Sequence, residues 1–241
     1  MSLQKVLFLI VFFISYTVQA ITGFAGNILA MPPGIYLIGM DTTIVLLNVA
    51  GVLGCGMLAV KCWKSIDWKH FSRVIVVLFV FLFVGIWLDT VLPLKILLTI
   101  YGVIIITVAL RNLALKKQIE VPTWLLWIVV ACAGIIQGMF VSGGAFLVIW
   151  ATHTLKGRDT FRGTMSLIWT VLNLVYLVIK TVQGVWTAET VQLVLFLLPL
   201  IFISTFLGDR LQRHIGKEGF IRFVYVLLLC IGVFTTASSL M

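Results

Sequence analysis

The chain has 241 residues, of which 62% are hydrophobic and only 10% are charged. No soluble domain of this size is so apolar, so the composition excludes a soluble enzyme or binding module and indicates an all-α polytopic membrane protein. The net charge of +9 does not indicate nucleic-acid binding, because the basic residues lie in short connections between apolar stretches. Basic residues at such places orient a membrane protein and contact anionic lipid, so we expect a lipid bilayer around this chain.

Eight apolar segments follow one another along the chain. They run over about residues 6–38, 42–60, 71–88, 92–110, 122–155, 161–180, 189–207 and 220–240. Six of them have the length of one bilayer crossing, roughly 17–25 residues. The first and the fifth are too long, because as continuous helices they would reach roughly 50 Å, against about 30 Å of hydrocarbon. We therefore expect each of these two to be a re-entrant helical hairpin or a broken helix.

Both long segments are interrupted by glycine near the middle, and the interruptions belong to an internal repeat. Residues 19–42 recur without a gap 118 residues later, as residues 137–160. The identities in register are Gln19/Gln137, Gly26/Gly144, Leu29/Leu147, Gly39/Gly157, Asp41/Asp159 and Thr42/Thr160. Short hydrophobic segments broken by glycine at matching places in two halves are the best sequence indication of a transporter's binding site. We predict a first repeat over 1–115 and a second over 120–241, within a single membrane domain.

The first 20 residues have the pattern of a signal peptide, with Lys5 before an apolar run and Val18-Gln19-Ala20 as a cleavage site. Cleavage there would remove Gln19, which is the repeat partner of Gln137. We therefore expect this segment to stay in the protein as part of the first repeat.

The basic residues distinguish between the two shapes of the long segments. If both segments cross the membrane, nine basic residues lie on one side and eight on the other. If both are re-entrant, fourteen lie on one side, within 61–73, 111–117, 156–162 and 210–222, and only three lie opposite. The positive-inside rule requires the second distribution. We predict re-entrant hairpins in a multi-pass protein of the cell inner (plasma) membrane, with the basic loops in the cytoplasm and both termini outside.

Re-entrant hairpins also determine the symmetry of the fold. One hairpin plus three transmembrane helices gives each repeat an odd number of crossings, so the second repeat enters the membrane inverted relative to the first. The predicted fold is therefore two inverted repeats related by a pseudo-two-fold axis in the membrane plane. The two hairpin tips then approach each other near mid-membrane from opposite sides.

The tips have the chemistry of an anion site. The second arm of each hairpin begins near Asn27 or Ala145, so its free N–H groups and the positive end of its dipole face the tip. Glycine lets the backbone turn sharply there and approach a ligand closely. The predicted substrate-binding residues are Gln19, Thr22, Gly23, Gly26, Asn27, Gln137, Ser142, Gly143 and Gly144 at the tips, with Asn48 and Asn173 inside their helices. The alternative is that these small and polar residues only let helices pack closely and hydrogen-bond.

Charged residues and cysteines give no further site. No acid or base lies in the middle of a crossing segment, which does not support a dedicated proton relay. Asp41 and Asp159 stand where helices begin, which favours helix capping over a proton-binding carboxylate. Lys180 and Arg162 flank the sixth segment, where topology alone accounts for them. The cysteines show no CxxC spacing, which favours core packing over a metal site or a disulfide.

At its glycine clusters the chain resembles the TauE/SafE family, also called the sulfite exporter or toluene-sulfonate uptake permease family. Residues 138–146, Gly-Met-Phe-Val-Ser-Gly-Gly-Ala-Phe, are similar to the family's glycine-rich second-half motif. Residues 23–26, Gly-Phe-Ala-Gly, match the first-half motif less well, because that motif is usually richer in glycine. The resemblance covers essentially the whole chain. It implies membrane transport of small sulfur-containing or carboxylate anions, such as sulfite and organosulfonates, without a bound organic cofactor.

Three alternatives to such a carrier stay open. A passive anion channel can use the same midplane site, and the substrate of a carrier can be a small carboxylate without sulfur. An intramembrane enzyme is remote, because a rhomboid-type protease needs Gly-x-Ser-Gly, and Phe140 occupies the first glycine position. The sequence also lacks the His-Glu-x-x-His pattern of a zinc protease. The number of subunits is not determined, and a homodimer is one option.

Overall fold

The computed structural model describes residues 2–22, 25–114, 122–211 and 217–240. They form ten α-helices and one short 3-10 turn at Trp63–Ser65. The helices are α1 (Leu3–Thr22), α2 (Ala25–Ile38), α3 (Met40–Lys61), α4 (Trp68–Val91), α5 (Leu94–Ala114), α6 (Thr123–Phe140), α7 (Gly144–Thr154), α8 (Arg158–Val182), α9 (Ala188–Leu211) and α10 (Lys217–Leu240). Seven of them, α1, α3, α4, α5, α6, α8 and α9, are long and apolar enough to cross a membrane. This confirms the prediction of an all-helical polytopic membrane protein.

Each long apolar segment folds into two helices that pack against one another. α1 and α2 form the first such hairpin, and α6 and α7 form the second. Between α6 and α7, Val141 has a φ of 53°, in the left-handed region, and α7 begins at Gly144. A β-branched residue rarely adopts this conformation, so the contacts around the turn must hold it there. The first arms, α1 and α6, are each long enough to cross a membrane, whereas the second arms have 14 and 11 residues.

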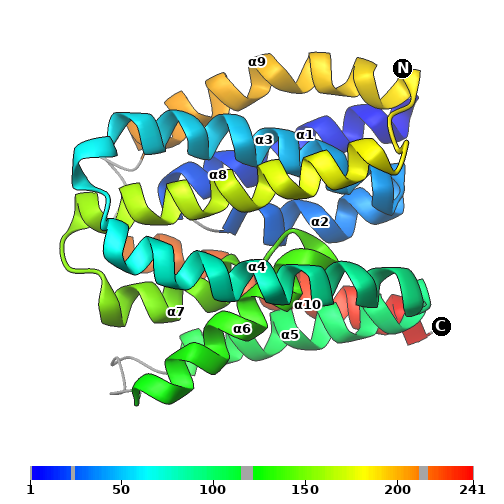
Figure 1. Cartoon of the computed structure of the whole chain (residues 1–241). Helices are drawn as coiled ribbons and strands as arrows, with labels where there is room; N and C mark the ends of the chain where they lie inside the picture. Colours follow the sequence, from blue (N-terminus) through cyan, green and yellow to red (C-terminus); the bar gives the residue numbers. More distant parts are fainter. Residues whose placement is uncertain (1, 23–24, 115–121, 212–216, 241) are drawn as a thin grey trace.

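The packing of the helices repeats when the two halves of the chain are exchanged. In chain order, α1–α5 of the first half correspond to α6–α10 of the second. α3 packs on its counterpart α8, and α5 packs on its counterpart α10. In the same way, α1 packs on α9 just as α6 packs on α4. The fourth helix of each half therefore packs on the first helix of the other half. Both chain ends lie at the same end of the bundle (Figure 1).

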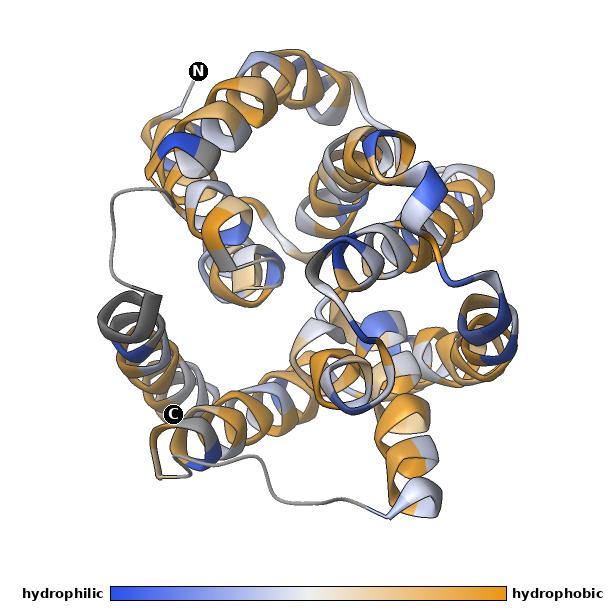
Figure 2. Ribbon diagram, turned by 90° about the vertical axis from the view of Figure 1, so that its left-hand side faces the viewer, coloured by the Kyte–Doolittle hydropathy of each residue, from blue (hydrophilic) through white to orange (hydrophobic). Residues whose placement is uncertain are grey.

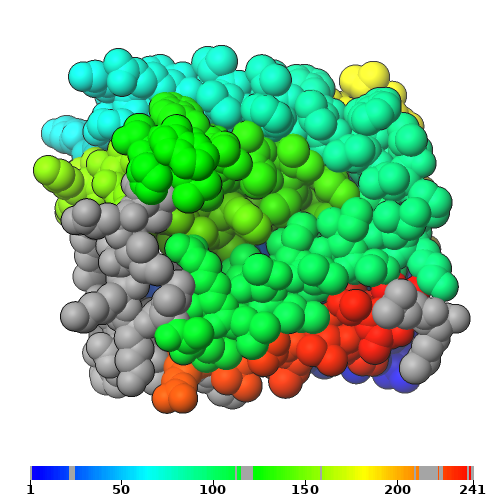
Figure 3. Space-filling model, turned by 90° about the horizontal axis from the view of Figure 1, so that it is seen from below, coloured from blue at the N-terminus to red at the C-terminus, as the bar shows by residue number. Residues whose placement is uncertain are grey.

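The outer surface of the bundle is apolar. Val76, Val80, Phe83 and Trp87 follow one face of α4, and all four side chains are exposed. Figure 2 shows hydrophobic residues along most of the length of the helices, and Figure 3 shows α4 and α5 on either side of α6 on the lower face. A soluble monomer rarely exposes contiguous apolar patches of this kind. The surface is suited to contact with lipid chains.

α4 and α6 approach closely because both carry glycine where they touch. A Cβ atom at Gly85 would run into the Ile135 carbonyl oxygen, and one at Gly138 would run into the Leu82 carbonyl oxygen. Small residues at such crossings let helix backbones approach and are frequent between membrane helices. This contact fixes the helix that leads to the second hairpin tip.

We predict that Gly138→Ala destabilises the protein by about 1–3 kcal/mol, the range for overpacked interiors. The reason is that the added methyl group meets backbone that cannot move aside. Thermal unfolding of the purified protein in detergent measures the change. Gly54→Ala is the matched control, since the nearest atom to its Cβ is the Ile201 Cγ2 at 4.0 Å. This control should be neutral or stabilising, because alanine favours a helix over glycine; a similar loss in both variants would contradict the close-packing argument.

Candidate functional site

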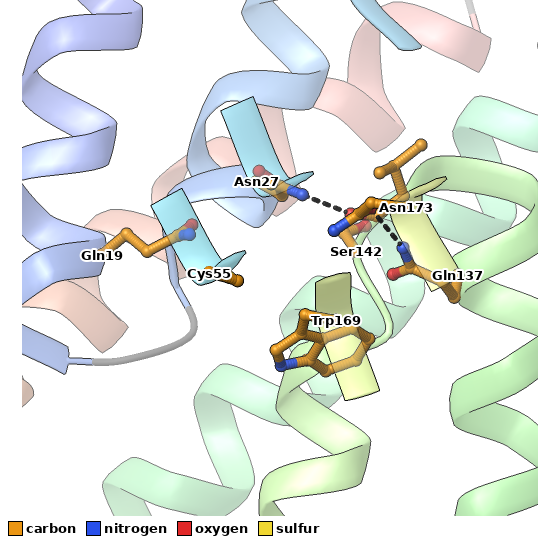
Figure 4. Close-up of a pocket in the computed structure, with 10 residues that line it drawn as sticks. Gln19, Asn27, Cys55, Gln137, Ser142, Trp169 and Asn173 are labelled. Carbon is orange, nitrogen blue, oxygen red and sulfur yellow. Dashed lines mark hydrogen bonds between the residues drawn. The ribbon is translucent and has the colours of Figure 1, made fainter. Parts of the chain in front are cut away.

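The two hairpin tips meet inside the bundle, at a polar pocket between α3 and α8 (Figure 4). The empty space of the pocket is about 330 Å³, which includes space open to solvent. Its lining residues are Gln19, Asn27, Gly51, Cys55, Gln137, Val141, Ser142, Gly144, Trp169 and Asn173. Asp, Glu, Lys, Arg and His do not occur among these lining residues. The pocket therefore offers hydrogen bonds and backbone dipoles to a ligand, and not a fixed charge.

Asn27 joins the first hairpin to the second. Its side-chain Nδ2 donates a hydrogen bond of 2.8 Å to the carbonyl oxygen of Val141, at the other tip. The Tyr16 hydroxyl donates to Asn27 Oδ1 at 2.7 Å and so fixes the orientation of the amide. Because the Val141 carbonyl leaves the regular helix at the left-handed turn, it needs a partner from outside its own helix. The first hairpin supplies that partner.

Gln137 supports the second tip from within its own hairpin. Its Oε1 accepts a hydrogen bond from the Gly143 N–H at 3.1 Å, and its Nε2 donates to Asn173 Oδ1 on α8 at 3.0 Å. The Ser142 hydroxyl donates to the Tyr101 hydroxyl at 2.8 Å, and the Tyr101 ring stacks on Phe140 with centroids 4.3 Å apart. These bonds connect the tip to α5 and to α8. The second tip is thus held by side chains that are themselves buried.

α3 and α8 close the pocket with residues that are related by the internal repeat. Gly51 is the repeat counterpart of Trp169, and Cys55 is the counterpart of Asn173, at the same offset of 118 that relates Gln19 to Gln137. A Cβ atom at Gly51 would run into the Asn173 amide. Gly51 therefore makes the space into which the asparagine side chain fits.

The structure brings together six of the eleven predicted site residues. They are Gln19, Asn27, Gln137, Ser142, Gly144 and Asn173. Thr22 is the last residue of α1, but its side chain and the whole of Gly23 lie outside the described residues.

The other three predicted residues do not line this pocket, although two of them contact residues that do. A Cβ atom at Gly26 would run into the Gln19 side chain, and one at Gly143 would run into the Ala133 carbonyl oxygen. Both glycines permit close packing within their own hairpins. Asn48 is fully buried in α3, where its Nδ2 donates to the Ile44 carbonyl oxygen at 2.8 Å.

Four lining residues were not predicted, namely Gly51, Cys55, Val141 and Trp169. The internal repeat could have predicted three of them. Applying the offset of 118 to Asn173 gives Cys55, and the residues one helical turn before these two are Trp169 and Gly51. Val141 had no such indication, because only its backbone turn brings it to the pocket.

The prediction that Asp41 and Asp159 cap helices is wrong. The N-caps of α3 and α8 are Gly39 and Gly157, and neither makes a side-chain capping bond. Asp41 instead lies beside Lys180, with 2.9 Å between its Oδ1 and the lysine Nζ. The two glycines have φ values of 83° and 90°, a conformation open to glycine and strained for other residues, which explains why they recur in both repeats.

The start of α7 gives the pocket its electrostatic character. The first N–H groups of a helix have no carbonyl one turn earlier, and they carry the positive end of the helix dipole. Gly144 is the first residue of α7 and lines the pocket. Together with the amides of Gln19, Asn27 and Asn173, this arrangement can hold a small anion without a buried cation.

A bundle of helices long enough to cross a membrane, with a small polar pocket inside it, is typical of a membrane transport protein. A family model described as "Sulfite exporter TauE/SafE" matches residues 7–235. The chain therefore belongs to the TauE/SafE sulfite exporter family of membrane transporters, and it is not an enzyme. It is 24% identical over 177 residues to the "Probable inner membrane transporter protein TsaS" of Comamonas testosteroni, across 72% of this chain and 74% of that relative. The comparison with solved structures gives no match.

We predict that Gln137→Ala destabilises the protein, because it leaves the Gly143 N–H and Asn173 Oδ1 buried without these partners. Each buried unsatisfied group costs about 1–3 kcal/mol. The midpoint of thermal unfolding in detergent measures the loss. Gln183→Ala, at the exposed end of α8, is the matched control and should leave the midpoint unchanged. An unchanged midpoint for Gln137→Ala would show that this glutamine does not hold the tip.

Proposed function

We propose that this protein is a secondary carrier of small anions, with sulfur-containing anions such as sulfite or organosulfonates as substrates. The observation that carries the proposal is the meeting of two glycine-interrupted hairpin tips at one polar pocket lined by amides, a hydroxyl and a helix start. Backbone N–H groups at a helix start suit a sulfite or sulfonate group, because these anions present several acceptor oxygens. The family and the relative's name as an inner membrane transporter support the same class of function.

Alternating access around this pocket follows from inverted repeats, which we also propose. The exchange of packing partners between the halves supports them, as do the three repeat pairs Gln19/Gln137, Gly51/Trp169 and Cys55/Asn173 in the pocket lining. In such a fold, rocking of one half against the other opens a fixed midplane site to each side in turn. The bond between Asn27 and the Val141 carbonyl crosses the boundary between the halves, so it lies where that motion occurs.

The proposed orientation places the basic loops in the cytoplasm and both termini outside, in the inner membrane. Fourteen of the chain's seventeen Lys and Arg residues then lie on the cytoplasmic side, as the positive-inside rule requires. The junctions from α3 to α4 and from α7 to α8 lie at one end of the bundle, and the chain ends lie at the other (Figure 1). Lys5 and the junction that carries Lys61 and Lys64 therefore lie at opposite ends, which requires an odd number of passes between them. Counting α2 as the returning arm of a re-entrant hairpin, with α3 as the crossing, gives this odd number.

Uptake of labelled sulfite into liposomes that hold the purified protein tests this function. Unlabelled taurine, sulfoacetate, thiosulfate, sulfate and lactate serve as competitors. We expect saturable uptake that a subset of these anions blocks and that internal anion stimulates. A conductance without saturation would indicate a channel, and competition by lactate alone would indicate a carboxylate carrier. Absence of both uptake and competition would contradict sulfur anions as the substrate class.

We predict that Ser142→Trp abolishes this uptake, because the indole fills the pocket at the second tip. Ser72→Trp on the exposed start of α4 is the matched control and should transport like the unchanged protein. Both variants should be expressed and should elute from size-exclusion chromatography in detergent as the unchanged protein does. Equal uptake by the two variants would refute a site at the hairpin tips.

Cys55 gives a second test, because among the four cysteines it alone lines the pocket. In a variant whose other cysteines are replaced by serine, substrate should slow the reaction of Cys55 with a small neutral maleimide. In the corresponding variant that keeps only the exposed Cys230, the reaction rate should not respond to substrate. A Cys55 rate that is the same with and without a transported anion would place the substrate elsewhere.

A further inference from the structure

A buried lysine lies between two carboxylates at the end of α8. Lys180 Nζ is 2.9 Å from Asp41 Oδ1 on α3 and 3.8 Å from Asp89 Oδ2 on α4. The side chains of Lys180 and Asp89 are only 7% and 10% exposed, whereas that of Asp41 is 64% exposed. Removing such groups from water costs several kcal/mol each, which only pairing offsets. The cluster of Lys180, Asp41 and Asp89 is here called the ion triad.

The ion triad carries one cation and two carboxylates, so its fully ionised form has one excess negative charge. The other ionisable group on α8 near it is Tyr176, one turn earlier, whose hydroxyl donates to the Gly138 carbonyl oxygen at 2.7 Å. α6 also packs on α4 and has no charged residue. Its one thiol, Cys132, lies more than a turn before Gly138, where α6 crosses α4. Lys95 at the start of α5 is exposed. Lys180 lies beside Asp89, with 3.8 Å between its Nζ and Asp89 Oδ2.

The ion triad lies on the same helix faces as the pocket. Asn173, Tyr176 and Lys180 follow one another on α8 at spacings of three and four residues, which puts them on one face. Lys180 is seven residues beyond Asn173, or about 10 Å along the helix axis. The face of α3 opposite carries Asp41, then Asn48, then the pocket residue Gly51 at spacings of seven and three. A line of polar groups therefore runs from the pocket to the end of the bundle where the chain termini lie.

Asn48 lies on this line and has an unsatisfied hydrogen-bond acceptor. Its Oδ1 is buried and has no hydrogen-bond partner among the described residues. A buried acceptor without a partner costs about 1–3 kcal/mol, so such atoms are kept where water or a ligand visits them. Asn48 is one turn from Gly51 on α3, between the pocket and Asp41. This unsatisfied acceptor therefore lies between the pocket and the ion triad.

The internal repeat does not reproduce the ion triad at the opposite end. The counterparts of Asp41, Asp89 and Lys180 are Asp159, Leu207 and Cys62. At that end α8 packs closely on the end of α3, since a Cβ atom at Gly163 would lie 3.0 Å from the Cys62 Cβ. The repeat therefore places neither a cation nor a carboxylate at the positions equivalent to Lys180 and Asp89.

We propose that the ion triad is a proton-binding gate, with Asp89 as the group that binds the proton. This inference rests on the proposed carrier function. In the arrangement seen, both carboxylates hold Lys180 and so hold α8 against α3 and α4. An anion that enters from this end forms an ion pair with Lys180 in place of Asp89. The Asp89 carboxylate is then without its cation in apolar surroundings, and it binds one proton from the solvent. One proton then accompanies each anion, so that a monoanion moves without net charge.

Two transport assays with labelled sulfite test the gate. The first measures exchange of internal for external sulfite at equal pH, and the second measures accumulation when the external solution is one pH unit more acidic. With one proton per anion, the unchanged protein should accumulate sulfite up to about tenfold, since a tenfold ratio corresponds to about 1.4 kcal/mol. Asp89→Asn should still exchange sulfite. With the pH gradient, it should accumulate no more sulfite than it does at equal pH. Asp159→Asn, at the exposed repeat counterpart of Asp41, is the matched control and should accumulate sulfite as the unchanged protein does.

The outcomes separate the gate from the carrier function itself. Accumulation by Asp89→Asn that still follows the pH gradient would overturn the gate and leave the carrier standing. If the unchanged protein exchanges sulfite but does not accumulate it in response to the pH gradient, the gate is likewise overturned and the carrier stands. Absence of both exchange and uptake in the unchanged protein would refute the proposed function for sulfite, and the gate with it. If Asp89→Asn does not fold, the pair Asp89→Asn with Lys180→Gln, which leaves no unpaired buried charge at these two positions, should show the same loss of gradient response.

Discussion

Backbone that leaves a helix inside a bilayer must find its hydrogen bonds within the protein, because lipid chains offer none. The rest of this structure depends on how the two hairpin tips meet that requirement. The Val141 carbonyl receives its hydrogen bond from Asn27 in the other half of the chain, and the Gly143 N–H finds Gln137 in its own hairpin. Because one half completes the backbone of the other, the tips have to lie side by side. The polar pocket is the space that remains where they do.

The same constraint explains the composition of the pocket. A charged side chain at mid-membrane is costly without a partner, whereas amides and hydroxyls can satisfy one another and still present a donor to a ligand. Gln137 illustrates this, because it bonds both Gly143 and Asn173 and also lines the pocket. The buried charges lie further out, at the ion triad, where Asp41 is in contact with solvent. Binding and charge compensation are thus separated along α3 and α8.

Much of the fold followed from the sequence because its causes are local or repeated. Segment length and glycine position predicted that each long segment divides into two helices, and the 118-residue offset brought Gln19, Gln137 and Gly144 to the site. The contribution of α3 was harder to predict, since Gly51 acts through the space it leaves for Asn173 and not through chemistry of its own. The role of Asp41 was missed for a different reason. Its position after Gly39 suggests a local cap, whereas its partner Lys180 is 139 residues away and is brought close only by the packing of α3 on α8.

The bond from Asn27 to Val141 also has a consequence for how the protein is made. The two residues are 114 positions apart, and a ribosome adds about 5–20 residues per second. The first hairpin is therefore in the membrane for many seconds before its partner tip has been synthesised, and α1 waits still longer for α9. During that time the Asn27 amide lacks its Val141 partner, and water, lipid headgroups or the insertion machinery must take its place. A mutation in the first half can therefore act during biogenesis as well as on the stability of the finished fold.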